Sequence, residues 1–207
     1  MSGLGRRALL GKGALLAKGA LVVAFALSHG AAAQDTDSPA LPGDLAKSPL
    51  LDSWIGVDAD GDITVFTGKA ELGQGLKTAL IQIAAHELAV AASAVDIVTA
   101  DTARTPDEGV TAGSHSLQDS GTAILNAAAN VRVLLAEAAA WRYAIAVDQI
   151  EMRDGAAHAP DGRTVGYGEL VSGLSLHVTA RPNVPRREGG SKVIGRASCR
   201  ERVSKQV

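Results

Sequence analysis

Two observations predict a mixed α/β fold, an α+β arrangement of short strands and hairpins with two main helices. Along the middle of the 207-residue chain, apolar runs of strand length alternate with two longer segments whose apolar residues recur at helical spacing. The turn-forming pairs Asp154-Gly155 and Asp161-Gly162 separate the short runs near the end of that region. Strands and helices that alternate in this way build layers in which helices cover a sheet.

The first half of this region is predicted to contain a hairpin, a helix and a third strand. Apolar runs at 51–57 and 63–67 flank an acidic, glycine-containing turn at 58–62, a pattern typical of paired strands. Residues 76–90 carry their large apolar side chains on one helical side, and a strand is expected at 95–99. The apolar residues of that helix are Leu76, Leu80, Ile83 and Leu88.

The second half is predicted to contain a long loop, a long helix and further short elements. The loop at 103–120 is polar, and loops of this length are usually functional or disordered. The helix at 121–146 is rich in alanine, and its apolar periodicity includes Trp141, which we expect in the core. The remaining elements are a hairpin at 150–153 and 156–158, a helical turn at 167–170 and a strand at 174–179.

The amino-terminal 33 residues have the layout of a bacterial export signal. They begin with Arg6-Arg7, contain no acidic residue and pass through a short apolar stretch to three alanines at 31–33. The adjacent arginines resemble a twin-arginine signal. The alternative is a membrane anchor, but Lys18 and His29 bracket an apolar run much shorter than the ~20 residues that a span needs. We therefore expect a periplasmic protein with no stable membrane span after cleavage.

The carboxyl-terminal residues 194–207 have neither apolar periodicity nor a recognisable turn pattern. Their first ten residues resemble one reading frame of a sequencing-library adaptor. The alternative is a basic, disordered tail. We expect a non-native tail, in which case Cys199 does not belong to the protein.

The chain between these two ends is acidic. Four of the 20 basic residues lie in 1–33 and four in 194–207, whereas only one of the 22 acidic residues lies in either segment. Residues 34–193 therefore carry 12 basic and 21 acidic residues, a net charge of -9, and no cysteine. This charge excludes nucleic acid as the main partner. The lack of cysteine excludes zinc or iron–sulfur sites built on thiolates.

A glycine-rich segment at 68–75 and a segment of small and hydroxyl residues at 111–116 precede the two main helices. Glycine lets the backbone approach a ligand, and free N–H groups at a helix N-terminus favour an anion. Two such segments point to one extended anionic ligand. Two alternatives stay open: a tight structural turn at the first segment, and ordinary helix caps at both.

These segments carry a resemblance to a known family. Residues 71–75 (Glu-Leu-Gly-Gln-Gly), the helix after them and residues 111–116 (Thr-Ala-Gly-Ser-His-Ser) resemble the molybdopterin-binding large subunits of the xanthine dehydrogenase/aldehyde oxidase family. Within it, the isoquinoline 1-oxidoreductase and nicotinate dehydrogenase type is the most similar, over residues 51–171. The resemblance implies a molybdenum hydroxylase that oxidises N-heterocycles or aldehydes with water as the oxygen source. The implied cofactor is molybdopterin, as a dinucleotide, with molybdenum.

The resemblance also implies roles for individual residues. Leu72, Gly73 and Gln74 would contact the molybdenum centre or the pterin, with Gln74 donating its side-chain amide to an oxo ligand. Hydroxyl and backbone N–H groups of the second segment would hold the pterin or its phosphate, from Thr111, Gly113, Ser114 and Ser116. No residue of the chain is expected to bind the metal directly, because the dithiolene of the pterin holds it.

Two parts of the family's machinery are expected outside this chain. The catalytic glutamate, a general base, lies later than Val193, and the iron–sulfur clusters lie on a small partner subunit. We therefore expect the 207-residue chain to be inactive alone. The competing hypothesis is an exported domain that binds a ligand or partner without catalysis. The expected organisation is an export signal at 1–33, a linker at 34–50, a partial molybdopterin-binding domain at 51–180, the start of a truncated continuation at 181–193 and the non-native tail at 194–207.

Overall fold

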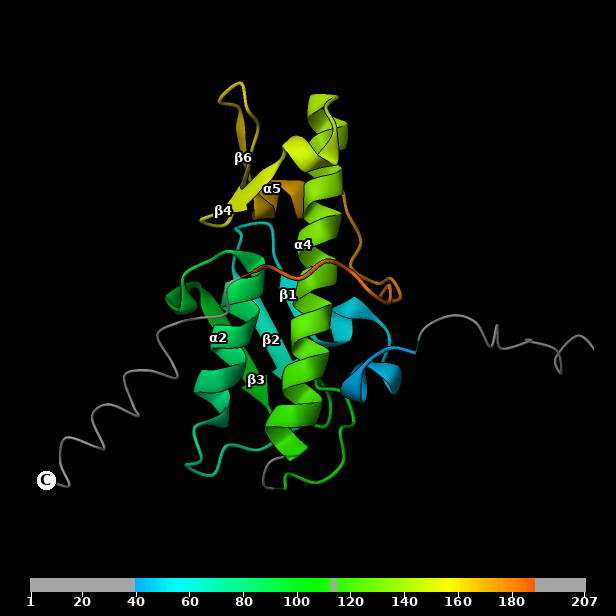
Figure 1. Ribbon diagram of the computed structural model, residues 1–207. Coiled ribbons are helices and arrows are strands. Elements are labelled where there is room, and N and C mark those ends of the chain that lie inside the picture. The colour runs from blue at the N-terminus through cyan, green and yellow to red at the C-terminus, as the bar shows by residue number, and fades with distance from the viewer. Residues whose placement is uncertain (1–39, 113–114, 189–207) are drawn as a thin grey trace, which may run out of the picture. The chain divides into compact units, whose positions relative to one another are not determined.

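The computed structural model describes residues 40–112 and 115–188 (Figure 1). The predicted export signal and the predicted non-native tail lie outside these residues, as do Gly113 and Ser114. The mixed α/β class is confirmed. In chain order the helices and strands are β1 (Ile55–Val57), β2 (Ile63–Thr67), α2 (Leu76–Leu88), β3 (Val95–Thr99), α4 (Gly121–Tyr143), β4 (Glu151–Arg153), β5 (Ala156–His158), β6 (Thr164–Gly166) and α5 (Tyr167–Val171).

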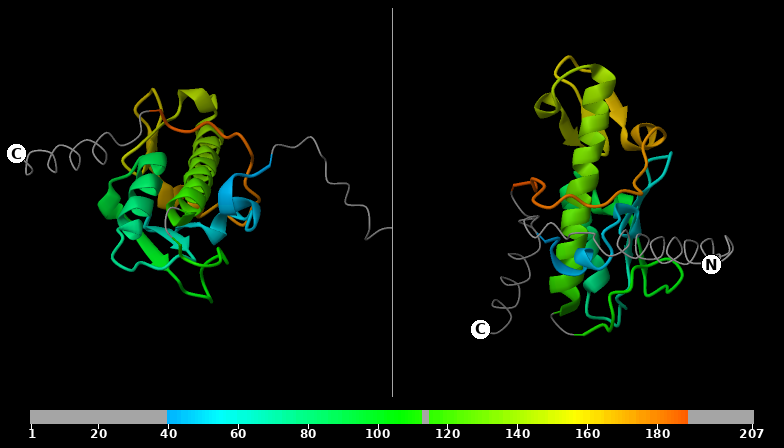
Figure 2. Two further views of the ribbon diagram at one scale, coloured as in Figure 1. Left: turned by 60° about the horizontal axis from the view of Figure 1, so that its bottom comes forward. Right: turned by 90° about the vertical axis from the view of Figure 1, so that its right-hand side faces the viewer.

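The first sheet has the strand order β1-β2-β3. Strand β1 pairs with β2 as the predicted antiparallel hairpin, whereas β3 pairs with β2 in parallel, with Thr67 opposite Thr99. A parallel pair needs a crossover connection, which α2 provides. Helices α2 and α4 pack against each other and against this sheet (Figures 1 and 2).

The core lies between this sheet and the two helices. Along β2, every second residue is buried, so Ile63 and Val65 point toward the helices. Helices α2 and α4 are in contact, and both contribute alanines as well as larger apolar residues to the core. The buried alanines of these helices include Ala84, Ala85, Ala123, Ala127 and Ala128.

Helix α4 and the π-helical turn before it, η4 (Ser116–Ser120), are long and apolar enough to cross a membrane. However, 61% of their most apolar window is buried inside the fold. Packing against α2 and the sheet therefore accounts for the apolar composition of this helix.

The prediction that Trp141 lies in the core is wrong, because its side chain is 87% exposed. Leu135 and Ala139 are buried and lie four residues apart, so the buried stripe advances by four residues at this end of α4. Trp141 follows Ala139 by two residues and so lies about 200° around the helix, on the far side.

The second sheet has the order β4-β5-β6 and lies beside the carboxyl-terminal end of α4. The sequence prediction omitted its third strand, β6, which has only three residues. The strand predicted at 174–179 is absent except for one bridge between Leu50 and Thr179. Its neighbour is the 3-10 turn η2 (Leu51–Ser53), which cannot continue a ladder.

Residues 40–50, predicted as part of a linker, pack onto the body of the fold. The short 3-10 helix η1 (Gly43–Ala46) contacts α4, and its Leu45 is fully buried. At the other end, residues 180–188 run along the helices, where Asn130 of α4 accepts the N–H of Arg181 and donates to its carbonyl. Both segments are therefore held by the folded body.

Candidate functional site

Two loops meet at one edge of the first sheet. Because β2 and β3 run in parallel, both end at the same edge, where Figure 1 shows their arrows pointing. The loop at 68–75 follows β2 and leads into α2, and the loop at 100–112 follows β3 and precedes η4 and α4 in the chain. Ligands of open α/β sheets bind beyond the carboxyl ends of the strands. We therefore refer to these two segments as the first and second loops of a candidate site.

The backbones of the two loops approach each other closely at Gly68. A Cβ atom built at this position would fall closer than 3.0 Å to the carbonyl oxygen of Pro106, a separation that side chains essentially never show. A glycine is therefore needed where the first loop leaves β2.

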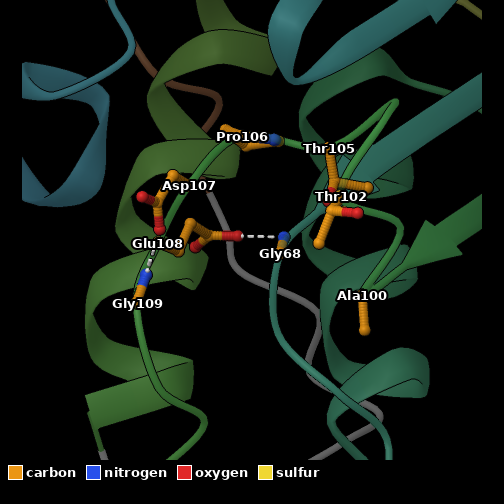
Figure 3. A pocket seen from close by; sticks show the side chains of 8 residues that line it. All are labelled: Gly68, Ala100, Thr102, Thr105, Pro106, Asp107, Glu108 and Gly109. Atoms are coloured by element: carbon orange, nitrogen blue, oxygen red, sulfur yellow. Dashed lines mark hydrogen bonds between the residues drawn. The ribbon is translucent and has the colours of Figure 1, made fainter.

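Glu108 joins the two loops from inside. Its carboxylate accepts hydrogen bonds from the hydroxyl of Thr67 at 2.6 Å, from the N–H of Gly68 at 2.6 Å and from the hydroxyl of Ser120. Figure 3 shows the side chain reaching from the second loop to Gly68. Glu108 is only 4% exposed, so these donors take the place of water around a buried charge.

Lys69 joins the same loops through a buried ammonium group. Its Nζ donates to the carbonyl oxygen of Glu108 at 2.6 Å and to that of Val110 at 3.1 Å. The nearest carboxylate is that of Asp44 in η1, with 4.0 Å between Nζ and Oδ2. Asp44 is itself buried and forms an ion pair with Lys47 at 2.6 Å. Residues that the sequence assigned to a linker therefore support the candidate site.

The carboxylate of Glu71 binds backbone N–H groups within the first loop and at the start of α2. The side chain of Glu71 accepts the N–H groups of Lys77 at 2.8 Å, Gly75 at 3.1 Å and Gly73 at 2.7 Å. These backbone donors, that of Lys77 first, hold the pKa of Glu71 below its usual range. The N–H groups that we expected to be free for an anionic ligand are thus bound to Glu71. Gly73 and Gly75 have φ values of +93° and +81°, which glycine adopts without strain.

Gln74 and Leu72 lie at the exposed tip of the first loop. The Gln74 side chain folds back, so that Nε2 donates to the carbonyl of Ala70 at 2.8 Å and Oε1 accepts the N–H of Leu72 at 2.6 Å. A glutamine amide has two N–H groups, and the described residues bind one of them. Gln74 can therefore keep this loop geometry and still donate outward. Leu72 is 80% exposed.

The predicted residues of the second loop have internal partners. The hydroxyl of Thr111 accepts the N–H of Ala70 at 2.8 Å, which ties the second loop to the first. Ser116 is buried, and its hydroxyl accepts the N–H of Ala112 at 3.1 Å. The Thr111 hydroxyl keeps its own proton for a ligand, whereas Ser116 would have to open its turn to reach one.

The outer surface of the two loops fits a pterin. Space is open beside Gly73, Gly75 and Gly109, where an added Cβ would meet nothing within 4 Å. Leu72 and Val110, which is 82% exposed, offer apolar side chains for a flat ring. The second N–H of the Gln74 amide and the hydroxyl proton of Thr111 can hydrogen-bond its edge.

A cavity of about 420 Å³ lies between the loops beside Glu108. Thr102, Thr105 and Asp107 line it together with the backbone of Gly68 (Figure 3). Within residues 40–112 and 115–188, no three His, Cys, Asp or Glu side chains gather closely enough to hold a metal ion.

Sequence reasoning missed Lys69 and Glu108. The signal for Lys69 was present, because it continues the alternation of buried residues along β2 two positions beyond Thr67, and a lysine on a buried face needs partners. Glu108 gave no such signal, because it lies in a polar loop without periodicity.

Comparison with known proteins identifies the family. The sequence profile of the molybdopterin cofactor-binding domain matches residues 16–192. The chain belongs to this family. The resemblance inferred from residues 71–75 and 111–116 is thereby confirmed, and molybdopterin is the cofactor of the domain.

Three relatives of this molybdopterin-binding domain illustrate how much of each protein it covers. A nicotinate dehydrogenase subunit from Pseudomonas putida is 33% identical over 155 residues, 74% of this chain and 13% of the relative. The beta subunit of isoquinoline 1-oxidoreductase from Brevundimonas diminuta is 33% identical over 163 residues, 74% of this chain and 20% of the relative. The crystal structure of quinoline 2-oxidoreductase from Pseudomonas putida 86 aligns with a TM-score of 0.50 and 28% identity, over 63% of this chain and 17% of that one. The chain thus spans a fifth or less of the length of each of these three relatives.

Proposed function

We propose that the chain is the amino-terminal part of the large subunit of a molybdenum hydroxylase that oxidises N-heterocycles or aldehydes, with water as the oxygen source. The observation that carries the proposal is the meeting of residues 68–75 and 106–112 beyond β2 and β3, within a molybdopterin-binding domain. The names of the relatives support the substrate class, because they act on nicotinate, isoquinoline and quinoline.

In this function the residues of the chain bind and orient the cofactor. Leu72 and Gly73 would border it, Gln74 would donate its remaining N–H, and the Thr111 hydroxyl would bind the pterin or its phosphate. Gly113 and Ser114 keep their predicted phosphate-binding role as part of this proposal. When bound, the cofactor supplies the two-electron redox chemistry. The general base is expected outside this chain.

A small iron–sulfur subunit as electron acceptor is part of the proposal. Support comes from the names of the relatives from Pseudomonas putida and Brevundimonas diminuta, both of which are described as subunits. The absence of cysteine from residues 34–193 is compatible with clusters held by another chain.

The decisive experiment uses the complete large subunit, co-expressed with its partner. We expect the purified complex to contain molybdenum and pterin, to oxidise nicotinate, isoquinoline or an aldehyde, and to incorporate oxygen from ¹⁸O-labelled water. The 207-residue chain alone should show no oxidation. A complex without molybdenum and without activity would favour the alternative, an exported domain that binds a ligand or partner without catalysis.

We also propose export to the periplasm after cleavage of residues 1–33. The paired arginines, the apolar stretch and the alanines at 31–33 support it. Amino-terminal sequencing of the protein from a periplasmic fraction should begin at Gln34. A protein that keeps Met1, or that stays in the cytoplasmic fraction, would contradict this part of the proposal.

A further inference from the structure

We propose that Glu108 is a positioning residue that holds the two cofactor loops in the single arrangement that binds molybdopterin. The inference rests on the proposed function, because it assigns a role within the same site. Glu108 would not touch the cofactor itself. It would act through the loops that do.

The first step of the argument is the origin of the three donors to Glu108. Thr67 is the last residue of β2, Gly68 begins the first loop, and Ser120 ends the turn before α4. Glu108 itself belongs to the second loop. A single side chain therefore joins a strand, both loops and the start of the long helix.

The second step is the chemistry of this contact. A carboxylate only accepts hydrogen bonds, and all three partners donate to it. The Thr67 hydroxyl can donate to Glu108 and at the same time accept the N–H of Lys69 at 3.2 Å. Thr67, Ser120 and Glu108 are all buried, so water does not replace the carboxylate without movement of the loops.

The third step is the fixed position of the second loop's backbone. The Lys69 ammonium binds the carbonyls of Glu108 and Val110, and the Ala70 N–H binds Thr111. These bonds join the loops at residues 69–70 and 108–111, whereas the Glu108 carboxylate reaches the ends of β2 and of the turn before α4. Without the Glu108 carboxylate these bonds stay, but both loops lose their link to Ser120 at the start of α4 and to the Thr67 hydroxyl at the end of β2.

A second buried carboxylate provides a matched control. Glu87 is fully buried near the end of α2, about 17 Å along the helix from its start. It binds Arg132 of α4 at 3.0 Å and the N–H of Arg187 at 2.9 Å. Its replacement should weaken the fold without changing the loops.

The test compares Glu108→Ala, Glu108→Gln and Glu87→Gln in the complete large subunit with its partner. The readouts are molybdenum per folded protein, the rate of pterin release followed by the fluorescence of the released, oxidised pterin, and the melting temperature. If Glu108→Ala leaves the loops in the binding arrangement a tenth of the time, apparent cofactor affinity falls about tenfold. Glu108→Gln should be intermediate, because its amide oxygen still accepts one donor. Glu87→Gln should melt earlier but release pterin at the wild-type rate.

Two results would overturn this inference without affecting the proposed function. In the first, Glu108→Ala releases pterin at the wild-type rate. In the second, Glu87→Gln releases pterin as fast as Glu108→Ala does, when both variants have lost the same amount of melting temperature. If Glu108→Ala cannot be purified folded, Thr67→Val removes the donor to Glu108, together with the acceptor of the Lys69 N–H, at nearly constant shape, and it must show faster release for the inference to stand. A wild-type complex without molybdopterin would overturn the proposed function, and this inference with it.

Discussion

Replacing Gly68 by alanine tests whether the two loops must lie as close together as they do. The added Cβ would fall closer than 3.0 Å to the Pro106 carbonyl oxygen, whereas ordinary contacts begin at 3.4 Å. The φ of Gly68 is not in the left-handed region, so alanine meets no backbone strain there. Any loss of stability therefore measures the close approach itself.

Two costs are expected when the loops separate. Overpacking a tight contact costs about 1–3 kcal/mol. Loss of the 2.6 Å bond from the Gly68 N–H to the Glu108 carboxylate adds roughly 1.5–3 kcal/mol, the range for bonds to charged groups. Because each kcal/mol lowers the melting temperature of a chain of this size by about 2–4 °C, the variant should melt roughly 5–24 °C earlier.

Gly168→Ala is the matched control, because its Cβ would also fall closer than 3.0 Å to a carbonyl oxygen, that of Ala59. Its expected cost is overpacking alone, about 1–3 kcal/mol. Circular dichroism measures the melting of both variants, and amide hydrogen exchange reports on residues 106–112. The reasoning is refuted if Gly68→Ala melts with the wild type, or if both variants expose residues 106–112 to exchange equally.

Three further predictions concern single side chains. The backbone N–H groups bound to Glu71 should stay protected from amide exchange at neutral pH and lose protection in acid, because the pKa of Glu71 is lowered and its stabilisation of the loop is lost as pH falls through the folded-state value. In Glu71→Gln this pH dependence of exchange should disappear. Trp141→Ala should change the free energy of unfolding by less than about 0.5 kcal/mol, whereas Trp54→Ala should cost about 3–5 kcal/mol in denaturant titrations; equal effects would contradict the burial pattern. Tyr167→Phe leaves the buried carbonyl of Leu88 without its donor and should lower the free energy of unfolding by about 1–3 kcal/mol. Because burial raises the pKa of Tyr167 to about 12, ultraviolet titration should show this phenol ionising only near that pH.

The spacing of apolar residues along the sequence predicted most of the helices and strands but not all of their ends. The strand at 95–99 and the start of α2 at Leu76 agree with the sequence, because apolar alternation and helical spacing are local properties. Helices α2 and α4 end earlier than predicted, since Ala89 and Ala144 adopt left-handed φ values of +58° and +55°. That conformation is common at glycine and costs alanine energy, so the sequence contains no signal for it.

The sequence indicated the two segments of the candidate site but not the bonds between them. Residues 71–75 and 111–116 stand out by composition, and the described residues 71–75 and 111–112 do precede α2 and η4. The bonds that join them depend on the parallel pairing of β2 and β3, which brings Gly68 and Glu108 together across 40 positions. Composition cannot give that pairing, because periodicity identifies a strand without naming its neighbour.

The parallel pairing of β2 with β3 also makes the two loops independent of the chain that connects them. Their spacing follows from strand register, with Thr67 opposite Thr99, and does not depend on the length of α2. The exposed residues 91–94 return the chain to β3 at the edge opposite the loops. An inserted reporter domain at 91–94 should therefore leave the candidate site intact, which makes this turn a practical site for labelling or immobilising the protein.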